Sequence, residues 1–168
     1  TRQLVDGGIE ALTVAFMNSY VDPVHEERTL EVVKDEFPDL PVTLSSNIVP
    51  EYGEYQRTLT SVMNSYGRPE VTNYMRRLED SLADEGFDGT LNIVRSDGGT
   101  MSSEMAMERP VDIAFSGPSG GVQGANYLAK KIGVSDVLTL DMGGTSTDVS
   151  LVHDGRSSVK RQIKVGYR

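Results

Sequence analysis

Residue types that hold phosphate and magnesium occur together at 141–148, in the sequence DMGGTSTD. Two adjacent glycines allow a backbone to approach a ligand closely and to reach positive φ, and the exposed N–H groups of such a turn form an anion-binding concavity. The hydroxyls of Thr145, Ser146 and Thr147 add hydrogen-bond donors. The carboxylate of Asp141 suits Mg²⁺, which prefers oxygen ligands and keeps part of its water shell. A purely structural hairpin explains the same residues, because Asp and Gly are common in turns between strands.

The segments on either side of this turn must position it. Apolar runs at 137–140 (VLTL) and 149–152 (VSLV) are typical of strands, so we expect a hairpin over 137–153. Upstream, the pattern predicts a helix from Pro118 to Lys131, ended by Gly133. The free N–H groups at its glycine-rich start can face an anion. Its apolar positions share one face: Val122, Ala125, Leu128, Ala129 and Ile132.

The rest of the chain alternates between strand and helix signals. Strands are expected within 10–19 and at 41–44 and 91–95, with an extended stretch at 111–115. Helices are expected from Asp22-Pro23 to Phe37 and from Ser102 or Ser103 to Met107.

The strongest helical signal runs over 53–82, with a proline in its middle at 69 that predicts a kink or two separate helices. Two stripes at helical spacing are expected to face the core: Tyr55, Leu59, Val62, Met63 and Tyr66, then Val71, Tyr74, Met75, Leu78 and Leu82. Glu54 and Arg57 on this helix are open to two interpretations, a solvated pair or part of a functional motif. Asp97, after the strand at 91–95, is either a turn residue or a residue that faces a ligand.

The hairpin segment resembles a known signature. Strand, D-x-G-G-T-S-x-D, strand is similar to the second phosphate-binding hairpin of actin, sugar kinases and heat-shock-chaperone ATPases. The version GGTSTDV at 143–149, preceded by SGPSGGV at 116–122, resembles the hydantoinase A / 5-oxoprolinase family, which also contains acetone and acetophenone carboxylase subunits. GIEAL at 8–12, EYQRT at 54–58 and SDGG at 96–99 agree with it, so the resemblance covers nearly the whole chain.

This resemblance implies an α/β fold made of partial actin-like ATPase (ribonuclease H-like) lobes, with a mixed sheet and flanking helices. Residues 1–66 would be the C-terminal part of the family's N-terminal region. Residues 67–168 would begin the hydantoinase A domain, with a connecting helix at 117–132 and the phosphate hairpin at 137–153. The family's first phosphate hairpin and its adenosine-binding glycine motif have no counterpart here, so we expect an internal fragment of a longer subunit, inactive by itself.

The resemblance also implies an ATP-dependent amidohydrolase that acts on cyclic amides, with ATP and Mg²⁺ as cofactors. Phosphorylation of a lactam or hydantoin carbonyl oxygen would make ring opening by water easier. Asp141 and Asp148 would be catalytic, and Asp141 would also bind the metal. The cofactor-binding residues would be Gly143, Gly144, Thr145, Ser146, Gly117, Gly120 and Gly121. Expected partners are a small-molecule cyclic amide or ketone and a second, B-type subunit.

Other functions remain open. One is an ATP-dependent ketone carboxylase subunit, in which a phosphorylated enol prepares carboxylation. Others are a small-molecule kinase of the same superfamily and a non-enzymatic ATP-gated module. The sequence GPSGG at 117–121 also fits the G-x-S-x-G elbow of serine hydrolases. We nevertheless predict that Ser119 is not a nucleophile, because the one downstream histidine, His153, follows Asp148 by only a few residues.

The amino-acid composition further limits the kinds of partner, metal site and location that we expect for this protein. The chain has 16 Lys and Arg against 25 Asp and Glu, a net charge of −9, which disfavours a nucleic-acid partner. Its longest apolar run is far short of a membrane span, and its start lacks a signal-peptide pattern. It has no cysteine and only two histidines, so neither disulfides nor a zinc site is expected. We therefore expect a cytoplasmic protein with no membrane or nucleic-acid partner.

Overall fold

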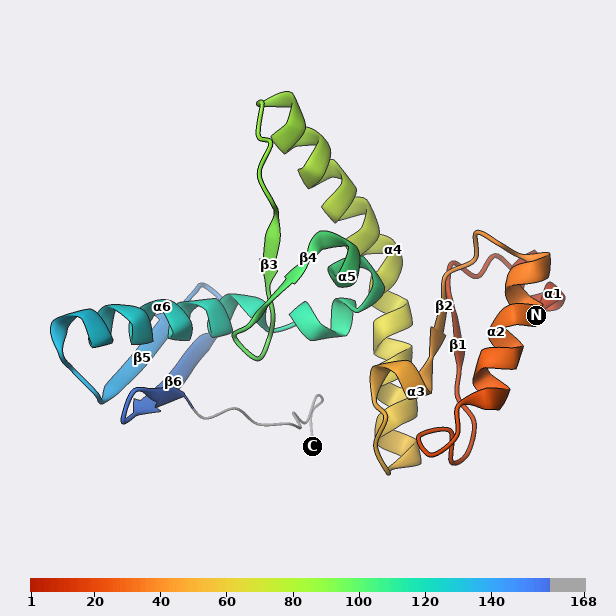
Figure 1. Ribbon diagram of the computed structural model, residues 1–168, viewed down its shortest axis with the longest axis horizontal. Helices are drawn as coiled ribbons and strands as arrows, with labels where there is room; N and C mark the ends of the chain where they lie inside the picture. Colours follow the sequence, from red (N-terminus) through yellow and green to blue (C-terminus); the bar gives the residue numbers. More distant parts are fainter. Residues whose placement is uncertain (158–168) are drawn as a thin grey trace. The chain divides into compact units, whose positions relative to one another are not determined.

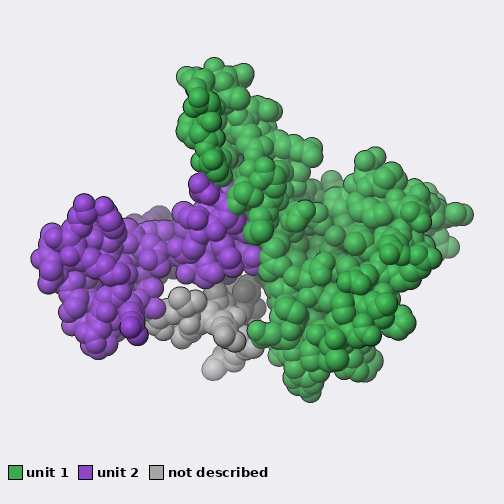
Figure 2. All heavy atoms as spheres, in the orientation of Figure 1, with its two compact units in different colours: residues 1–91, 102–111 green, residues 92–101, 112–168 purple. Residues whose placement is uncertain are grey.

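The structure is a computed structural model that describes residues 1–157. It divides the chain into two compact units, green and purple in Figure 2. Unit 1 contains residues 1–91 and 102–111, and the described part of unit 2 contains residues 92–101 and 112–157. Within residues 1–157, no helix combines the length and the apolar character that crossing a membrane requires.

Unit 1 begins with a strand–helix–strand arrangement (Figure 1). After the short helix α1 (Arg2–Asp6), strand β1 (Leu12–Val14) runs parallel to strand β2 (Val42–Leu44), and helix α2 (Val24–Glu36) connects the two. The pairing is in register along all three residues of each strand, from Leu12 opposite Val42 to Val14 opposite Leu44. A parallel pair needs a crossover connection, and α2 supplies it.

The ends of α2 follow from local chemistry, and the predicted boundaries are confirmed to within two residues. The carboxylate of Asp22 accepts a hydrogen bond from the backbone N–H of Val24 at 3.1 Å. Glu26 and Glu27 lie in the first turn, where negative charge is favourable. The helix ends before Phe37, because Pro38 disfavours helical backbone at the residue that precedes it.

One long helix dominates the rest of unit 1. After the short helix α3 (Ser45–Ile48), α4 (Glu54–Asp84) continues for 31 residues with Pro69 inside it. The alternative of two separate helices is therefore wrong, although the ribbon changes direction about halfway along (Figure 1). A proline removes one backbone hydrogen bond and bends a helix without having to end it.

The expectation that both apolar stripes of α4 face the core is wrong for the first stripe. Tyr55 is 74% exposed and Tyr66 is 89% exposed, and Leu59, Val62 and Met63 are exposed as well. In the second stripe Met75 is buried, but Tyr74 is exposed. The buried side of the first half of α4 is polar instead: Arg57, Ser61, Asn64 and Ser65. Hydrogen-bond partners compensate these groups for the loss of water, so polarity did not decide which face is buried.

The carboxylate of Glu26 lies at the centre of the buried polar groups, with no exposed surface. It accepts hydrogen bonds from Ser45 Oγ at 2.6 Å, from Ser46 N at 2.9 Å and Oγ at 2.8 Å, and from Phe16 N at 2.9 Å. These partners directly follow β1 and β2, so α2 ties together the carboxyl ends of both strands. Burial alone would raise the pKa of Glu26, but the hydrogen bonds from Ser45, Ser46 and Phe16 bring that pKa below its ordinary value.

Arg57 enters the same region from α4 and is also fully buried. Its guanidinium donates to Ser45 Oγ at 3.1 Å and to the carbonyl of Phe16 at 2.9 Å, and it forms an ion pair with Glu54. Its charged end lies 5.4 Å from the ring centroid of Tyr20. Ser45 thus links Glu26 to Arg57. The interpretation of Glu54 and Arg57 as a solvated pair is wrong for Arg57.

The chain leaves α4 through a glycine turn and returns in helix α5 (Ser103–Glu108). Of the two predicted caps, Ser102 is the one that caps α5, because its Oγ accepts a hydrogen bond from the N–H of Met105 at 3.3 Å. The following stretch, expected to be extended, forms the 3₁₀ helix η1 (Pro110–Ile113) instead. The proline fixes its own φ in the helical range.

Unit 2 is built around helix α6 and a hairpin. Strands β3 (Asn92–Val94) and β4 (Thr100–Ser102) form a two-stranded sheet. Helix α6 (Ser116–Ile132) ends at Gly133, which has the predicted left-handed conformation (φ 76°) and closes the last turn. Strands β5 (Val137–Met142), β6 (Thr147–His153) and β7 (Arg156–Ser157) follow in that order in an antiparallel sheet.

The predicted α/β class is confirmed, but the single mixed sheet is not. The described strands form three small sheets, and the parallel pair lies in a different sheet from the antiparallel strands. The four strands β1 to β4 have only three residues each and pair in twos. Strands this short offer few hydrogen bonds to a further neighbour.

Candidate functional site

The predicted hairpin forms as expected, and its two aspartates meet across it. Strands β5 and β6 pair from Val137 opposite Val152 to Met142 opposite Thr147, which places Asp141 directly opposite Asp148. Side chains at opposed positions of an antiparallel pair project from the same face. Two like charges at such a position destabilise a hairpin, whereas a divalent cation that takes oxygen ligands relieves the repulsion. The carboxylate pair thus fits Mg²⁺ chemically.

The turn between the strands is short and open. The N–H of Gly143 donates to the carbonyl of Ser146 at 3.0 Å, which closes the turn. Residues 143–146 lie exposed between the two strand ends. The structure therefore brings the predicted phosphate donors Gly143, Gly144, Thr145 and Ser146 together with Asp141 and Asp148 at one end of one hairpin.

The expected reason for the paired glycines needs correction. Neither Gly143 nor Gly144 has a positive φ, so backbone conformation does not require glycine at either position. A Cβ added at Gly144 would meet nothing within 4 Å, and one at Gly143 would lie 3.9 Å from the Ser146 carbonyl. The fold of the described chain therefore leaves the glycines unexplained. Glycine at both positions would allow a ligand to approach the backbone closely.

Helix α6 supports one face of the hairpin. It packs against both β5 and β6, and Asn126 on it donates from Nδ2 to the carbonyl of Gly155 at 3.2 Å. Ala129 of α6 and Val152 of β6 are buried. Val152 lies on the same face as Asp148, because the two are four residues apart in one strand. The other face is apolar and exposed: Leu138, Leu140, Met142, Val149 and Leu151.

The glycine-rich start of α6 has free space around its glycines in the described structure. A Cβ at Gly117 or Gly121 would meet nothing within 4 Å, and one at Gly120 would lie 3.7 Å from a methyl group of Val94. Glycine inside a helix costs about 1 kcal/mol relative to alanine, and the described residues show no packing that requires it at these positions. The structure shows no hydrogen bond between these three residues and the hairpin turn within residues 1–157.

Ser119 has the environment of a structural residue. Its hydroxyl donates to the carbonyl of Ser96 at 2.5 Å. The Oγ of Ser96 in turn accepts from the N–H of Phe115 at 3.0 Å, so the serines join the start of α6 to the β3–β4 turn. His153 pairs with Asp136, with Nδ1 and Oδ1 2.7 Å apart. Neither the serine nor the histidine is arranged as half of a nucleophile–base pair.

We therefore expect that Ser119→Ala leaves most of the catalytic activity of the whole protein in place and lowers stability by about 1 kcal/mol, the typical value of one hydrogen bond. An activity assay and a thermal unfolding curve of the variant measure these two effects. Labelling of the unmodified protein with a fluorophosphonate probe, followed by mass spectrometry, tests whether Ser119 is a nucleophile. Stoichiometric modification of Ser119 would contradict it and indicate a serine hydrolase.

Asp97 is a turn residue in this structure. Its Oδ1 accepts a hydrogen bond from the N–H of Gly99 at 2.9 Å, and its Oδ2 lies 3.1 Å from a guanidinium nitrogen of Arg95. Gly98 has a φ of 86°, which explains the glycine that follows Asp97. Of the two interpretations, these contacts support the structural one.

The sequence did not predict the one cluster with metal-ligand geometry among residues 1–157. Ligand atoms of Asp136, His153 and Asp154 lie within 4.8 Å of one another, and all three side chains are exposed. Hydrogen bonds explain the arrangement: the N–H of Asp154 donates to Asp136 at 3.0 Å, in addition to the His153 contact. These bonds lower the pKa of Asp136, that from Asp154 the most. The cluster clamps the β6–β7 turn to the residue before β5.

Comparison with known proteins places these features in a family. A sequence model described as hydantoinase/oxoprolinase matches residues 57–168, which include the hairpin and α6. The chain is 33% identical over 157 residues to the acetophenone carboxylase gamma subunit of Aromatoleum aromaticum, covering 90% of this chain and 21% of that protein. It is 32% identical over 156 residues to the 5-oxoprolinase of Saccharomyces cerevisiae, covering 92% of this chain and 12% of that protein.

A solved structure agrees with the sequence comparisons. The crystal structure of the ATP-dependent caprolactamase from Pseudomonas jessenii superposes with a TM-score of 0.81 and 31% identity, over 89% of this chain and 22% of that one. The chain thus spans between 12% and 22% of the length of these relatives. Because the family match covers two thirds of the chain and includes the candidate site, the chain belongs to the hydantoinase/oxoprolinase family.

Proposed function

We propose that the whole protein containing this chain is an ATP-dependent enzyme that activates the carbonyl of a cyclic amide for hydrolysis. The observation that carries the proposal is the hairpin end, where Asp141 and Asp148 oppose each other beside two glycines that the fold does not require. Two relatives support the substrate class, since one is named a 5-oxoprolinase and another an ATP-dependent caprolactamase. ATP would supply the phosphoryl group that makes the amide carbonyl reactive.

Each part of the hairpin has a role in this proposal. The backbone N–H groups and hydroxyls at 143–146 bind and orient phosphate oxygens. Asp141 holds Mg²⁺ directly or through its waters, and Asp148 braces Asp141 across the hairpin or shares the metal. Gly117, Gly120 and Gly121 leave the start of α6 open to an approaching anion. Positioning and charge neutralisation are what phosphoryl transfer requires of a protein.

The same proposal extends to the rest of the protein. Residues 1–66 end an N-terminal region, and residues 67–168 begin a hydantoinase A domain that belongs to an actin-like ATPase fold. The first phosphate hairpin and the adenosine site belong to parts of the protein outside this chain, and a separate B-type subunit is its partner. The protein acts in the cytoplasm on a small molecule.

Ketone carboxylation is the second candidate, because another relative is named as a subunit of acetophenone carboxylase. The same hairpin serves both reactions, since each needs a phosphorylated oxygen. The test is to incubate the whole protein with its partner subunit and ATP, with either a lactam or hydantoin panel or ketones plus bicarbonate. We expect ADP and ring-opened product from the cyclic amides. Carboxylated ketone with no ring opening would select the second candidate, and ATP hydrolysis that no substrate stimulates would contradict both.

We expect Gly144→Val to abolish nucleotide binding while changing stability by less than about 1 kcal/mol. The added side chain meets open space in the described structure, so folding tolerates it, but it fills the volume that a phosphate group would take. Calorimetric titration of the whole protein with Mg-ATP, beside a thermal unfolding curve, separates the two effects. Unchanged affinity for Mg-ATP would show that the hairpin has a structural role only.

A further inference from the structure

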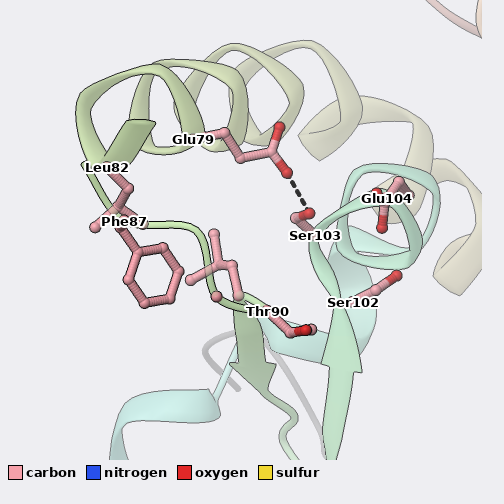
Figure 3. Close-up of a pocket in the computed structure, with 9 residues that line it drawn as sticks. Glu79, Leu82, Phe87, Thr90, Ser102, Ser103 and Glu104 are labelled. Atoms are coloured by element: carbon pink, nitrogen blue, oxygen red, sulfur yellow. Dashed lines mark hydrogen bonds between the residues drawn. The ribbon is translucent and has the colours of Figure 1, made fainter. Parts of the chain in front are cut away.

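A second candidate site lies in unit 1, in a pocket of about 280 Å³ (Figure 3). Three segments form it: the last turns of α4, the chain that returns from α4 toward β3, and the start of α5. The return is sharp because Gly86 adopts a φ of 81° and the N–H of Phe87 bonds back to the carbonyl of Leu82 at 2.9 Å. The pocket is thus built from backbone turns that local hydrogen bonds fix.

One wall of the pocket is apolar. Leu82 on α4 and Phe87 and Leu91 on the returning chain line it, and Figure 3 shows Leu82 and Phe87 next to each other. Phe87 is 48% exposed, so its ring is accessible to a molecule in the pocket. This wall can take a short hydrocarbon group.

The other wall is acidic. Glu79 on α4 accepts a hydrogen bond from the hydroxyl of Ser103, which is itself buried, and Glu104 lines the pocket one residue further along α5. A hydrogen bond from Ser102 lowers the pKa of Glu104 below its ordinary value. Within residues 1–157, neither Glu79 nor Glu104 has an ion-pair partner, and no basic side chain lines the pocket.

We propose that this pocket binds a small organic cation, a primary ammonium that carries a short hydrocarbon group. The ammonium donates to Glu79 and Glu104, and the hydrocarbon lies on Leu82 and Phe87. A bare divalent ion fits the pocket poorly, because Mg²⁺ keeps its waters and prefers an all-oxygen shell, which the apolar wall cannot provide. A neutral or anionic molecule of the same size would leave two carboxylates without a counter-charge.

The test is an NMR titration of the 168-residue chain with n-butylammonium chloride, with n-butanol and sodium butyrate as matched neutral and anionic probes. We expect saturable shifts for the amides of Gly89, Thr90 and Ser103 with butylammonium, and none of that pattern with the other two probes. Equal binding of n-butanol, or no saturable shift with the amine, would overturn the proposal.

Variants locate the charge that matters. Glu79→Gln keeps an acceptor for Ser103 but removes the charge, and we expect about a tenfold loss of butylammonium affinity, the typical effect of a charge-assisted hydrogen bond. Asp80→Asn is the control, since it removes a neighbouring exposed charge of α4 that does not line the pocket, and its affinity should be unchanged. If Glu79→Gln fails to fold, Glu104→Gln replaces it, since this side chain is exposed, and we expect a similar loss of butylammonium affinity. Equal losses in the control and in the pocket variants would mean that only overall charge attracts the amine.

Discussion

We expect Asp141→Asn in the whole protein to lower the rate of the proposed ATP-dependent turnover by at least about 100-fold while the protein remains folded. The substitution keeps the shape of the side chain and removes the charge that, in the proposed role of Asp141, holds Mg²⁺ and its waters. Loss of one electrostatic contact to a reacting group typically reduces kcat by about 10²–10³-fold. Because Asp141 and Asp148 repel each other across the strands, the free protein should become slightly more stable in the variant.

Steady-state kinetics and a thermal unfolding curve measure both effects. Asp154→Asn is the matched control, since it removes an exposed carboxylate from the opposite end of the same hairpin. Asp154 has a left-handed backbone conformation (φ 50°), which asparagine also adopts readily. Its turnover should stay within about twofold of the unmodified protein, the range we expect for a group outside the reacting centre. Near-normal turnover in Asp141→Asn would remove the metal role from this residue.

The second large effect is expected at Arg57. Arg57→Leu should lower the free energy of unfolding of unit 1 by about 3 kcal/mol, because removing one member of a buried charged network leaves its partners unpaired. The Phe16 carbonyl and the Ser45 hydroxyl would each lose a donor, and Glu54 would lose its ion-pair partner. Urea unfolding followed by far-ultraviolet circular dichroism measures the loss.

Arg28→Leu is the control for this experiment. Arg28 is paired with Glu31 at 2.5 Å on the surface of α2, where ion pairs contribute between 0 and about 1 kcal/mol. A loss in Arg57→Leu no larger than in Arg28→Leu would show that the buried network does not stabilise unit 1.

Glu26 adds a dependence on pH to the same unit. Its folded-state pKa lies below the ordinary value of 4.5. Its contribution to stability is therefore present above pH 4.5 and is lost as the pH falls through the folded-state pKa. Acid should therefore weaken the attachment of α2 to the ends of β1 and β2.

Local signals in the sequence predicted the ends of elements well. Gly133 ends its helix in a left-handed turn as predicted, and Ser102, one of the two predicted caps, begins α5. The predicted start of α2 at Asp22-Pro23 is confirmed to within one residue, since the helix begins at Val24. Burial was predicted poorly on α4, where Tyr55 and Tyr66 are exposed. Periodicity locates an apolar face but does not indicate which surface covers it.

Polar groups of the chain also differ in how well the sequence predicted them. The hairpin at 141–148 was predicted because its strands and turn are contiguous in sequence, and the facing of Asp141 and Asp148 follows from the register of a short hairpin. The buried link between Glu26 and Arg57 was not predictable, because it depends on residues from three elements that meet only in the fold. Pattern arguments treat such charged residues as surface.

The most direct measurement for the central claim is a crystal structure of the whole protein with Mg²⁺ and a non-hydrolysable ATP analogue. If the hairpin binds phosphate, oxygens of the nucleotide will lie about 3 Å from the backbone N–H groups at 143–146, the usual hydrogen-bond distance. Mg²⁺ will be held by Asp141, directly or through water. A nucleotide bound elsewhere, with Gly143 and Gly144 facing solvent and Asp141 free of metal, would contradict the account.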